Sequence, residues 1–254
     1  ISCLLTLQKI KKRNQEIGLY LPFFYDRNVK WPKPISTIYN NILSFILDQY
    51  TYIITINKYN QSILSKRSKK PVYIVSNSIS NKKLKTKGYI KNARLIFIGR
   101  LGVQKRITQL IYWLDKKDNP YKEILIIGDG PQMREIKILS NRCRNIKLTV
   151  KGWLTSDEQL NVIYKNDILI LNSLIEGEPM VLKESLLRGI RCISRRIGSI
   201  QEIIPEEYQF SSEIELIELL NKLSRDSIDE YFKKINLSKQ DREIEVNKLV
   251  NSIN

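Results

Sequence analysis

Two glutamates eight residues apart, Glu176 and Glu184, are the side chains best suited to binding a ligand rich in hydroxyl groups. They lie in the segment EGEPMVLKE, which follows the apolar run from Asp167 to Leu171. Because Pro179 favours a helix start, we expect a strand, a loop with Glu176, and a helix with Glu184 on its second turn. Carboxylates accept hydrogen bonds from hydroxyl groups. The alternative interpretation is an ordinary helix start with surface glutamates.

The first backbone amides of this expected helix form a candidate anion site. The N–H groups of Met180, Val181 and Leu182 have no preceding helical carbonyl to bind, because they belong to the first turn. Together with the helix dipole they suit a diphosphate. In an open α/β sheet such a site lies outside the carboxyl ends of the strands.

A glycine and two basic residues follow another expected strand, Arg94 to Ile98. Gly99 permits a close approach of the backbone, while Arg100 and Lys105 supply cations that would hold a diphosphate. Basic residues also occur at such turns on surfaces without a ligand. This pattern therefore indicates a site only in combination with the glutamates.

Missing residue types and motifs exclude several classes of function. The chain has no histidine, which excludes Ser-His-Asp and Cys-His catalysis and histidine-ligated metals. It has no GxGxxG, and the GDGP segment at 128–131 is not a dinucleotide fingerprint, so a dinucleotide-dependent oxidoreductase loses its main support. It also has no GxxxxGK[ST], which argues against a P-loop NTPase, and no Asp-x-Asp pair, which argues against a metal-chelated nucleotide site of that type. Trp153, beside Gly152 at the end of an expected strand, suits either the border of a nucleobase or, more commonly for a lone aromatic, packing.

The net charge of +17 is concentrated in the first third of the chain. Residues 1–92 contain 17 lysines and arginines against 3 acidic residues, whereas the remainder contains 26 against 23. Two basic clusters, 66–70 and 82–87, carry much of the excess. We expect an anionic membrane surface as the partner, with solvated surface lysines as the alternative. We expect no nucleic acid, because no RNA-binding aromatic signature, helix-turn-helix pattern or zinc finger is visible.

Composition and length are typical of a soluble globular protein. The 254 residues are 42% hydrophobic and 27% charged. The longest apolar-leaning stretch, Ile42 to Ile56, is too short and too polar to span a bilayer. The cysteines at 3, 143 and 192 are far apart, which indicates neither a zinc cage nor disulfides and favours a reducing cytoplasm. No signal peptide is visible, and the chain starts with Ile1, which leaves a missing upstream part open.

Short β-branched runs alternate with amphipathic helical patterns between 91 and 210, which predicts a parallel sheet covered by helices. Capping boxes are expected at Ser156 with Gln159 and at Ser212 with Glu215. The expected strands are 94–98, 123–127, 145–150, 167–171 and 190–194, with helices at 107–114, from 131, from 156, from 179 to near 189, and at 199–204. Upstream, strands at 52–56 and 72–75 flank a helix at 59–64, and the repeat of Val246, Leu249, Val250 and Ile253 indicates a helix near the end of the chain.

Taken together, these residues resemble glycosyltransferase family 4, the retaining enzymes of the two-Rossmann-domain GT-B fold. The agreement in order and spacing runs from about Arg94 to Ile204, less than half of the chain. The matching elements are FIGRL at 97–101 with Lys105, IGDGP at 127–131, Lys151-Gly152, DILI at 167–170, SLIEG at 173–177, Glu184, Gly189, and EII at 202–204 after Gly198. Residues 52–57 and 75–80 resemble, more loosely, the end of that family's N-terminal domain.

The resemblance implies a role for each of these residues. Glu176 contacts the hydroxyls of the donor sugar, Glu184 contacts the ribose, and Arg100 and Lys105 stabilise the diphosphate as it leaves. The Gly152 loop lies near the base. The implied catalytic residues are therefore Glu176, Arg100 and Lys105, and the implied donor-binding residues are Gly99, Gly152, Gly177, Met180, Val181, Leu182 and Glu184. The family is metal-independent, so no cofactor or metal is expected beside the nucleotide-diphosphate sugar.

The expected fold is α/β, with a Rossmann-like parallel sheet preceded by an incomplete N-terminal segment. Residues 1–90 are expected to form that basic, acceptor-side segment, with 82–87 as a linker. Residues 91–210 form the donor-binding domain and residues 211–254 the C-terminal helices. The first segment lacks the glycine-rich loop and the histidine common in the family, which leaves three alternatives: a fragment, a degenerate relative, or one half of a two-chain enzyme. Gly198-Ser199 replaces the more usual Gly-Gly, and Glu178 stands where the family often has an apolar or aromatic residue.

The expected activity is transfer of a hexose to a glycan or lipid-linked acceptor with retention of configuration, in surface polysaccharide assembly at the cytoplasmic face of the membrane. A non-catalytic, glycosyltransferase-like binding subunit of a two-chain enzyme is the rival hypothesis. A basic nucleic-acid-binding Rossmann protein is the third, and it would show strongly salt-dependent binding.

Overall fold

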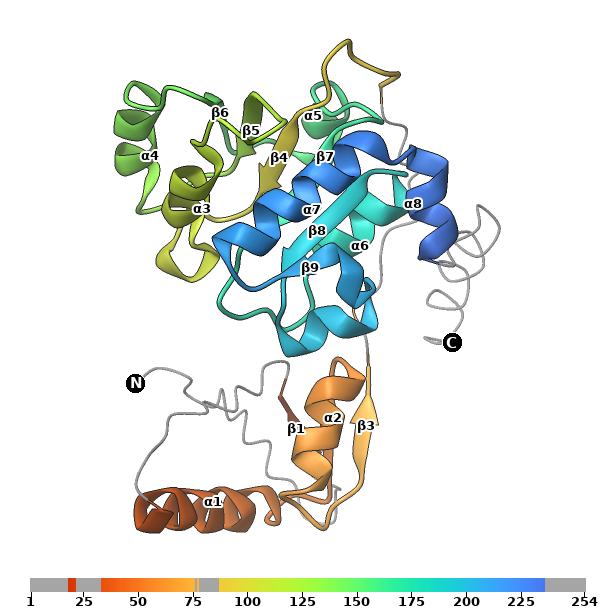
Figure 1. The fold of residues 1–254 in the computed structure, drawn as a ribbon. Helices are drawn as coiled ribbons and strands as arrows, with labels where there is room; N and C mark the ends of the chain where they lie inside the picture. Colours follow the sequence, from red (N-terminus) through yellow and green to blue (C-terminus); the bar gives the residue numbers. More distant parts are fainter. Residues whose placement is uncertain (1–17, 22–32, 76, 78–86, 236–254) are drawn as a thin grey trace. The chain divides into compact units, whose positions relative to one another are not determined.

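The computed structural model describes residues 18–21, 33–75, 77 and 87–235 (Figure 1). These residues belong to two compact units. The first unit runs to Asn77 and also includes the short loop Glu176–Glu178, and the second contains the remainder, 78–175 and 179 onward. The expected division into 1–90, 91–210 and 211–254 stays a prediction.

The second unit is built on six parallel strands in the order β6-β5-β4-β7-β8-β9. The chain starts in the middle at β4, moves outward to β6, and then returns to β7 on the other side of β4. This reversal is the topological switch point of a doubly wound sheet. The strands are β4 Leu95–Ile98, β5 Glu123–Ile127, β6 Lys147–Gly152, β7 Ile168–Leu171, β8 Arg191–Arg195 and β9 Gln209–Phe210.

Helices cover both faces of this sheet, with α7 in front of it and α6 behind it in the view of Figure 1. The α-helices are α3 Ile107–Leu114, α4 Met133–Ser140, α5 Ser156–Leu160, α6 Met180–Leu187, α7 Glu213–Arg225 and α8 Ile228–Lys234. The 3₁₀ turns are η1 Val103–Lys105, η2 Gly198–Glu202 and η3 Glu206–Tyr208. The α/β, Rossmann-like fold predicted from the alternating pattern is thus confirmed.

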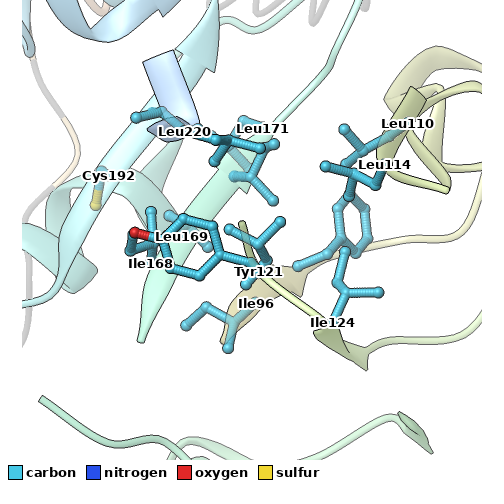
Figure 2. Close-up of a cluster of buried hydrophobic side chains, with 14 of the residues drawn as sticks. Ile96, Leu110, Leu114, Tyr121, Ile124, Ile168, Leu169, Leu171, Cys192 and Leu220 are labelled. Carbon is cyan, nitrogen blue, oxygen red and sulfur yellow. The ribbon is translucent and has the colours of Figure 1, made fainter. Parts of the chain in front are cut away.

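The core lies between the central strands and these helices (Figure 2). All four residues of β7 are buried, as expected for an apolar strand that has a neighbour on each side and a helix on each face. Leu110 and Leu114 of α3 pack in the same cluster as Leu220 of α7. Helices α7 and α8, within residues 213–234, therefore share the core of the sheet instead of forming one of their own.

Several element boundaries differ from the expectation. The N-cap of α5 is Thr155, not Ser156, and its capping box is completed by Glu158, not Gln159. Thr155 and Ser156 both suit an N-cap. Thr155 takes that position because the carboxylate of Glu158, three residues later, accepts a hydrogen bond from its backbone N–H and completes the capping box. The helix is also short and ends at Leu160. Pro131 precedes α4 without entering its first turn, because the N-cap of that helix is Gln132.

The described part of the first unit forms a sheet of three parallel strands in the order β1-β2-β3. The expected strands at 52–56 and 72–75 are confirmed as β2 and β3, and the helix between them as α2, whereas β1 and α1 were not predicted. The elements are β1 Gly18–Tyr20, α1 Lys33–Leu47, β2 Tyr52–Thr55, α2 Lys58–Ser65 and β3 Val72–Ile74. Leu19, Leu43, Leu47, Ile53 and Leu64 form their small core. The expected C-terminal helix from Val246 to Ile253 and the linker up to residue 86 lie outside the described residues.

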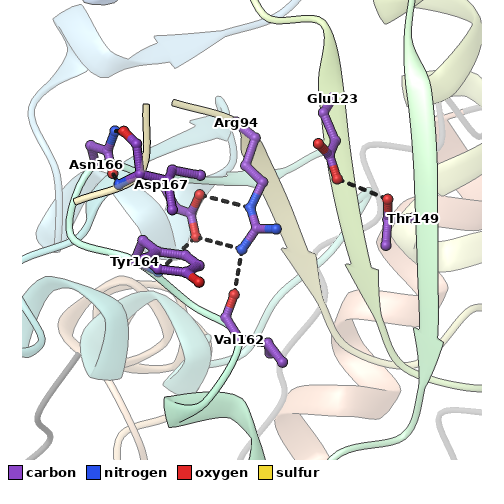
Figure 3. A network of polar contacts seen from close by, with 8 residues as sticks. Arg94, Glu123, Thr149, Val162, Tyr164, Asn166 and Asp167 are labelled. Carbon is purple, nitrogen blue, oxygen red and sulfur yellow. Dashed lines mark hydrogen bonds and ion pairs between the residues drawn. The ribbon is translucent and has the colours of Figure 1, made fainter. Parts of the chain in front are cut away.

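An ion pair ties together the starts of β4 and β7, at the amino ends of the strands (Figure 3). Arg94 donates from Nε and Nη2 to the two carboxylate oxygens of Asp167, at 3.0 and 3.2 Å. It also donates to the carbonyl of Val162, and the backbone N–H of Tyr164 donates to Asp167 at 2.8 Å. Burial raises the pKa of the Asp167 carboxyl, and the bonds from Arg94 and Tyr164 offset only part of that rise.

Replacing Arg94→Gln should lower the free energy of unfolding by about 3 to 5 kcal/mol at neutral pH, because it leaves a buried carboxylate without its cation. The pKa of Asp167 is already raised above 3.8 in the folded state, and loss of the arginine raises it further. The folded state then binds a proton more readily than the unfolded state, so the loss should shrink as the pH falls through the raised pKa. Denaturant unfolding from neutral pH down to pH 4 measures this effect.

The control is the double variant Arg94→Gln with Asp167→Asn, in which the pH-dependent part should disappear. A loss of stability in Arg94→Gln that is the same at every pH would contradict the assignment to the Asp167 carboxylate.

Candidate functional site

The carboxyl ends of β4, β5, β6 and β7 bring the candidate residues of the second unit to one edge of the sheet. Because all the strands are parallel, the turns that follow Ile98, Ile127, Gly152 and Leu171 emerge at the same edge. The switch point between β4 and β7 lies in the middle of this edge. Doubly wound sheets bind their ligands at this place.

Glycines allow the turns after β4 and β5 to touch backbone to backbone. The N–H of Gly99 donates to Ile127 O at 3.0 Å, and the N–H of Leu101 donates to Asp129 O at 2.8 Å. A Cβ on Gly128 would lie 1.9 Å from the carbonyl oxygen of Gly99, so no side chain fits there. Gly128 and Gly99 also both have φ of +151°, which side chains rarely tolerate.

The close approach of the backbone expected at Gly99 stays a prediction. Within the described chain, the nearest atoms to a Cβ on Gly99 would be 3.9 Å away, whereas the contact between the two turns needs the missing side chain of Gly128. Gly99 is also required by its positive φ. One of those atoms is Cε of Lys105, which places the side chain of Lys105 beside the glycine turn.

The two expected cations flank this turn. Arg100 is exposed, and Lys105 is half-buried as the last residue of η1. The next residue, Arg106, has a left-handed backbone with φ of +50° and begins α3, with its guanidinium 5.7 Å from the Trp113 ring centre. Three basic residues, Arg100, Lys105 and Arg106, therefore follow the carboxyl end of β4.

The loop after β7 is fastened to η1. The N–H of Leu174 donates to Gln104 O at 2.8 Å, and the side chain of Asn172 donates to Arg106 O at 3.3 Å. Asn172 is fully buried, and its Oδ1 has no hydrogen-bond partner in the part of the chain that the structure describes. Sequence reasoning missed Asn172, although a polar residue directly after an all-apolar strand was a usable signal.

The end of β6 presents an open glycine and an exposed ring. Gly152 has φ of +71°, and a Cβ there would meet no atom within 4 Å among the described residues. Trp153 is 70% exposed, so its interpretation as a packing residue is wrong. The N–H of Gly128 donates to Gly152 O at 2.7 Å, which links the third turn to the other two.

The start of α6 agrees only in part with the expected anion site. Pro179 is the N-cap and makes no side-chain capping bond, so a proline does begin this helix. The N–H of Leu182, however, donates to Pro179 O at 2.9 Å. Leu182 therefore does not offer the unpartnered amide expected of it, because the first turn is tightened to an i to i+3 bond.

Glu184 lies on the second turn of α6, as predicted, and its carboxylate is 4.0 Å from Nη2 of Arg188. Arg188 is buried and also donates to the side chain of Gln159 at 3.4 Å. Burial lowers the pKa of the Arg188 guanidinium, while Glu184 opposes that change. One carboxylate oxygen of Glu184 therefore faces the guanidinium of Arg188.

The loop with Glu176 and Gly177 belongs to the first unit. Glu176 is half-buried and Gly177 is buried. The carbonyl of Gly177 accepts a bond from Nδ2 of Asn57 at 2.6 Å, and Glu178 accepts one from the N–H of Asn77 at 2.9 Å. The structure thus brings four of the predicted residues to one edge of the sheet of the second unit: Gly99, Arg100, Lys105 and Gly152. Glu176 and Gly177 belong to the first unit.

The described residues contain neither a cluster of metal ligands nor a membrane-spanning helix. No group of three or more Cys, Asp or Glu side chains comes together there as a metal site would require. In the same residues, no helix combines the length and the apolar character needed to cross a bilayer.

The sequence model of a family described as "Glycosyl transferases group 1" matches residues 65–242. The curated relatives include the sulfoquinovosyl transferase of Arabidopsis thaliana, 30% identical over 115 residues, which are 45% of this chain and 22% of that protein. They also include the UDP-Gal:alpha-D-GlcNAc-diphosphoundecaprenol alpha-1,3-galactosyltransferase of Escherichia coli, 30% identical over 166 residues, which are 62% of this chain and 41% of that protein. This chain thus spans less than half the length of either relative.

Among solved structures, TarM is 16% identical with a TM-score of 0.69, covering 94% of this chain and 50% of that one. The pneumococcal O-GlcNAc transferase GtfA, in complex with UDP and GlcNAc, is 15% identical with a TM-score of 0.64, covering 92% and 50%. At these identities the likeness concerns the fold, and it agrees with the expected α/β, Rossmann-like fold.

Replacing Gly128→Ala should lower the free energy of unfolding by about 2 to 4 kcal/mol, because its Cβ would collide with the Gly99 carbonyl and its φ is unfavourable. Gly102→Ala is the matched control, since it has extended backbone with φ of −128° and no described atom within 4 Å of the new Cβ. Its unfolding free energy should change by less than about 0.5 kcal/mol. Equal losses in the two variants, measured by denaturant unfolding, would refute the contact between the turns.

Proposed function

Because this chain belongs to the family of group 1 glycosyl transferases, we propose that it supplies the donor-binding part of a metal-independent, retaining hexosyltransferase of glycosyltransferase family 4. The donor is a nucleotide-diphosphate sugar and the acceptor is a glycan or a lipid-linked sugar. One observation carries this proposal: Arg100 and Lys105 flank the glycine turns at the switch point of the sheet.

The diphosphate is the part of the donor that these residues suit best. Arg100 offers a planar guanidinium and Lys105 a point charge, and both bind phosphate oxygens. The amides of Met180 and Val181 at the start of α6 add the positive end of a helix dipole. Fixed cations and amides of this kind stabilise negative charge as it develops on a leaving group.

Transfer then needs one bond exchange at the anomeric carbon. The bond from the anomeric carbon to the diphosphate oxygen breaks, and the diphosphate takes the electron pair. The acceptor hydroxyl oxygen forms the new bond on the same face, which retains the configuration. The departing phosphate oxygen takes the hydroxyl proton, so the step balances without a histidine and without a cofactor.

The two glutamates bind the neutral parts of the donor in this proposal. Glu176 accepts hydrogen bonds from sugar hydroxyls, and Glu184 accepts them from the ribose with the carboxylate oxygen that does not face Arg188. Gly152 and the exposed Trp153 border the base. Neither glutamate acts as the acid or base of a hydrolase.

The alternative is a non-catalytic, glycosyltransferase-like binding subunit of a two-chain enzyme. Such a subunit would bind the nucleotide sugar without turnover, whereas the enzyme would release nucleoside diphosphate in the presence of an acceptor.

We further propose that the first unit attaches to an anionic membrane surface on the cytoplasmic side, where a lipid-linked acceptor for surface polysaccharide would lie. Ile42 and Phe45 are 55% and 68% exposed on one side of α1. Arg67 donates to the side chain of Asn40 at 2.9 Å, and the hydroxyl of Ser68 donates to Asp48 at 2.7 Å. These bonds hold the basic cluster 66–70 beside the same helix.

Lys105→Ala should weaken the binding of UDP or GDP, whichever binds the parent protein, by about tenfold or more, the usual effect of losing a charge-assisted hydrogen bond. Isothermal titration calorimetry measures the affinity. The matched control is Lys147→Ala, which removes an exposed lysine at the amino end of β6, the opposite edge of the sheet. Absence of binding at millimolar nucleotide, or equal loss in both variants, would refute the donor site.

Replacing Lys66, Lys69 and Lys70 together by Gln should weaken binding to phosphatidylglycerol vesicles by about a hundredfold, at roughly 1 kcal/mol per basic residue. Sedimentation with vesicles measures this binding, and it should also fall with added salt. Ile214→Ser, which changes an exposed apolar residue of α7 in the other unit, is the control and should bind as the parent does. Binding of the parent to neutral phosphatidylcholine vesicles at equal strength would contradict the proposal.

A further inference from the structure

Asn57 makes two hydrogen bonds that serve different parts of the first unit. It is the residue directly before α2, is only 8% exposed, and has an extended backbone suited to an N-cap. Its Oδ1 accepts the N–H of Asn60 at 2.8 Å, and its Nδ2 donates to the carbonyl of Gly177 at 2.6 Å. The second partner lies 120 residues away in the sequence.

The helix cap settles the orientation of the Asn57 amide. The N–H of Asn60 is a donor and can bind only the oxygen of that amide, so the nitrogen must point the other way. The carbonyl of Gly177 stands in that direction and can only accept. The cap therefore aims a donor at the loop Glu176–Glu178.

Capping α2 does not by itself require an asparagine. Serine, threonine or aspartate caps a helix about as well, because the cap needs only an acceptor oxygen. The amide nitrogen is the part of Asn57 that the cap does not use. Its bond goes to a buried carbonyl, which would lose free energy if it were left without a donor.

A second bond holds the other end of the same loop. The N–H of Asn77 donates to Oε2 of Glu178 at 2.9 Å. The peptide unit between Glu176 and Glu178 is thus fixed by one bond to its carbonyl and one to the following side chain. Glu176 directly precedes this fixed peptide, so the direction of its backbone is set by the same two contacts.

We infer that Asn57 is a positioning residue that, by holding the Gly177 carbonyl, sets the orientation in which Glu176 meets the donor sugar. The inference rests on the proposed function, in which Glu176 binds sugar hydroxyls. Asn57 does not touch the donor. It acts through the backbone of the loop, and it fixes that loop to the first turn of α2.

The variant Asn57→Asp isolates this role, because the carboxylate still caps α2 but cannot donate to Gly177 and faces its carbonyl oxygen instead. Hydrogen exchange of the peptide covering residues 174–180 should accelerate by about tenfold at pH 7, whereas the melting temperature should stay within a few degrees of the parent. Protonation would restore a donor, because a neutral carboxyl has one O–H and one acceptor oxygen. The protection factors should therefore recover toward the parent value near pH 4, close to the ordinary carboxyl pKa of about 3.9.

Two controls separate positioning from folding. Asn57→Ser keeps a cap, but its side chain is one atom shorter than the path to the Asn57 amide nitrogen and does not reach Gly177 at any pH, so its loss of protection should not recover in acid. Ser62→Gly weakens α2 on its exposed side without touching the loop and should leave exchange at 174–180 unchanged. Unchanged protection in Asn57→Asp, or an equal loss in Ser62→Gly, overturns the inference.

Ligand affinities test whether Asn57 acts on the donor through Glu176. In Asn57→Asp, the affinity for UDP-glucose or GDP-mannose should fall by about tenfold, while the affinity for UDP or GDP alone should stay unchanged, because only the sugar contacts Glu176. Equal losses for the sugar nucleotide and the free nucleotide overturn the link to Glu176. A parent protein that binds none of the four ligands refutes the proposed function, and the protection factors still decide whether Asn57 holds the loop.

Discussion

The candidate site depends on the contact between two backbone turns, which exists only because Gly128 has no side chain. The carbonyl of Gly99 occupies the space where a Cβ of residue 128 would stand, and backbone hydrogen bonds join the turns on either side of that contact. Lys105 packs beside the same turn, and the loop after β7 is bonded to η1. The parallel strands bring these three segments to a single edge of the sheet, and the missing side chains of Gly128 and Gly130 let the first two turns pack against each other.

The opposite edge of the same sheet carries an ion pair between Arg94 and Asp167. They are paired where β4 and β7 begin, with Asp167 fully buried and Arg94 largely so, away from the candidate residues. Strands β4 and β7 are thus paired by charge at their amino ends. At the carboxyl ends, the glycine turns join β4 to β5, and a backbone bond from Leu174 joins the loop after β7 to η1. Such a division leaves the carboxyl edge free to carry exposed cations such as Arg100 without weakening the core.

Local patterns predicted elements wherever the signal was confined to one segment. Strand β5 was predicted with its observed bounds, because a β-branched run ends there in Gly-Asp-Gly, and the end of α6 near Gly189 follows from a glycine with φ of +77°. The prediction failed where neighbouring residues compete for one role, as Thr155 and Ser156 do for a helix cap. It also missed α1, whose exposed Ile42 and Phe45 blur the helical pattern of its apolar residues.

Residue types and their spacing alone determined the α/β class, the absence of histidine chemistry, and the presence of cations and carboxylates near strand ends, because each of these depends on one short stretch of chain. Only the tertiary structure decided which of them meet. It showed that no side chain fits at Gly128, that the Leu182 amide is engaged, and that Trp153 is exposed. The bond from Asn57 to Gly177 spans 120 residues, and no local pattern carries information over that distance, because folding, not spacing, brings the two groups together.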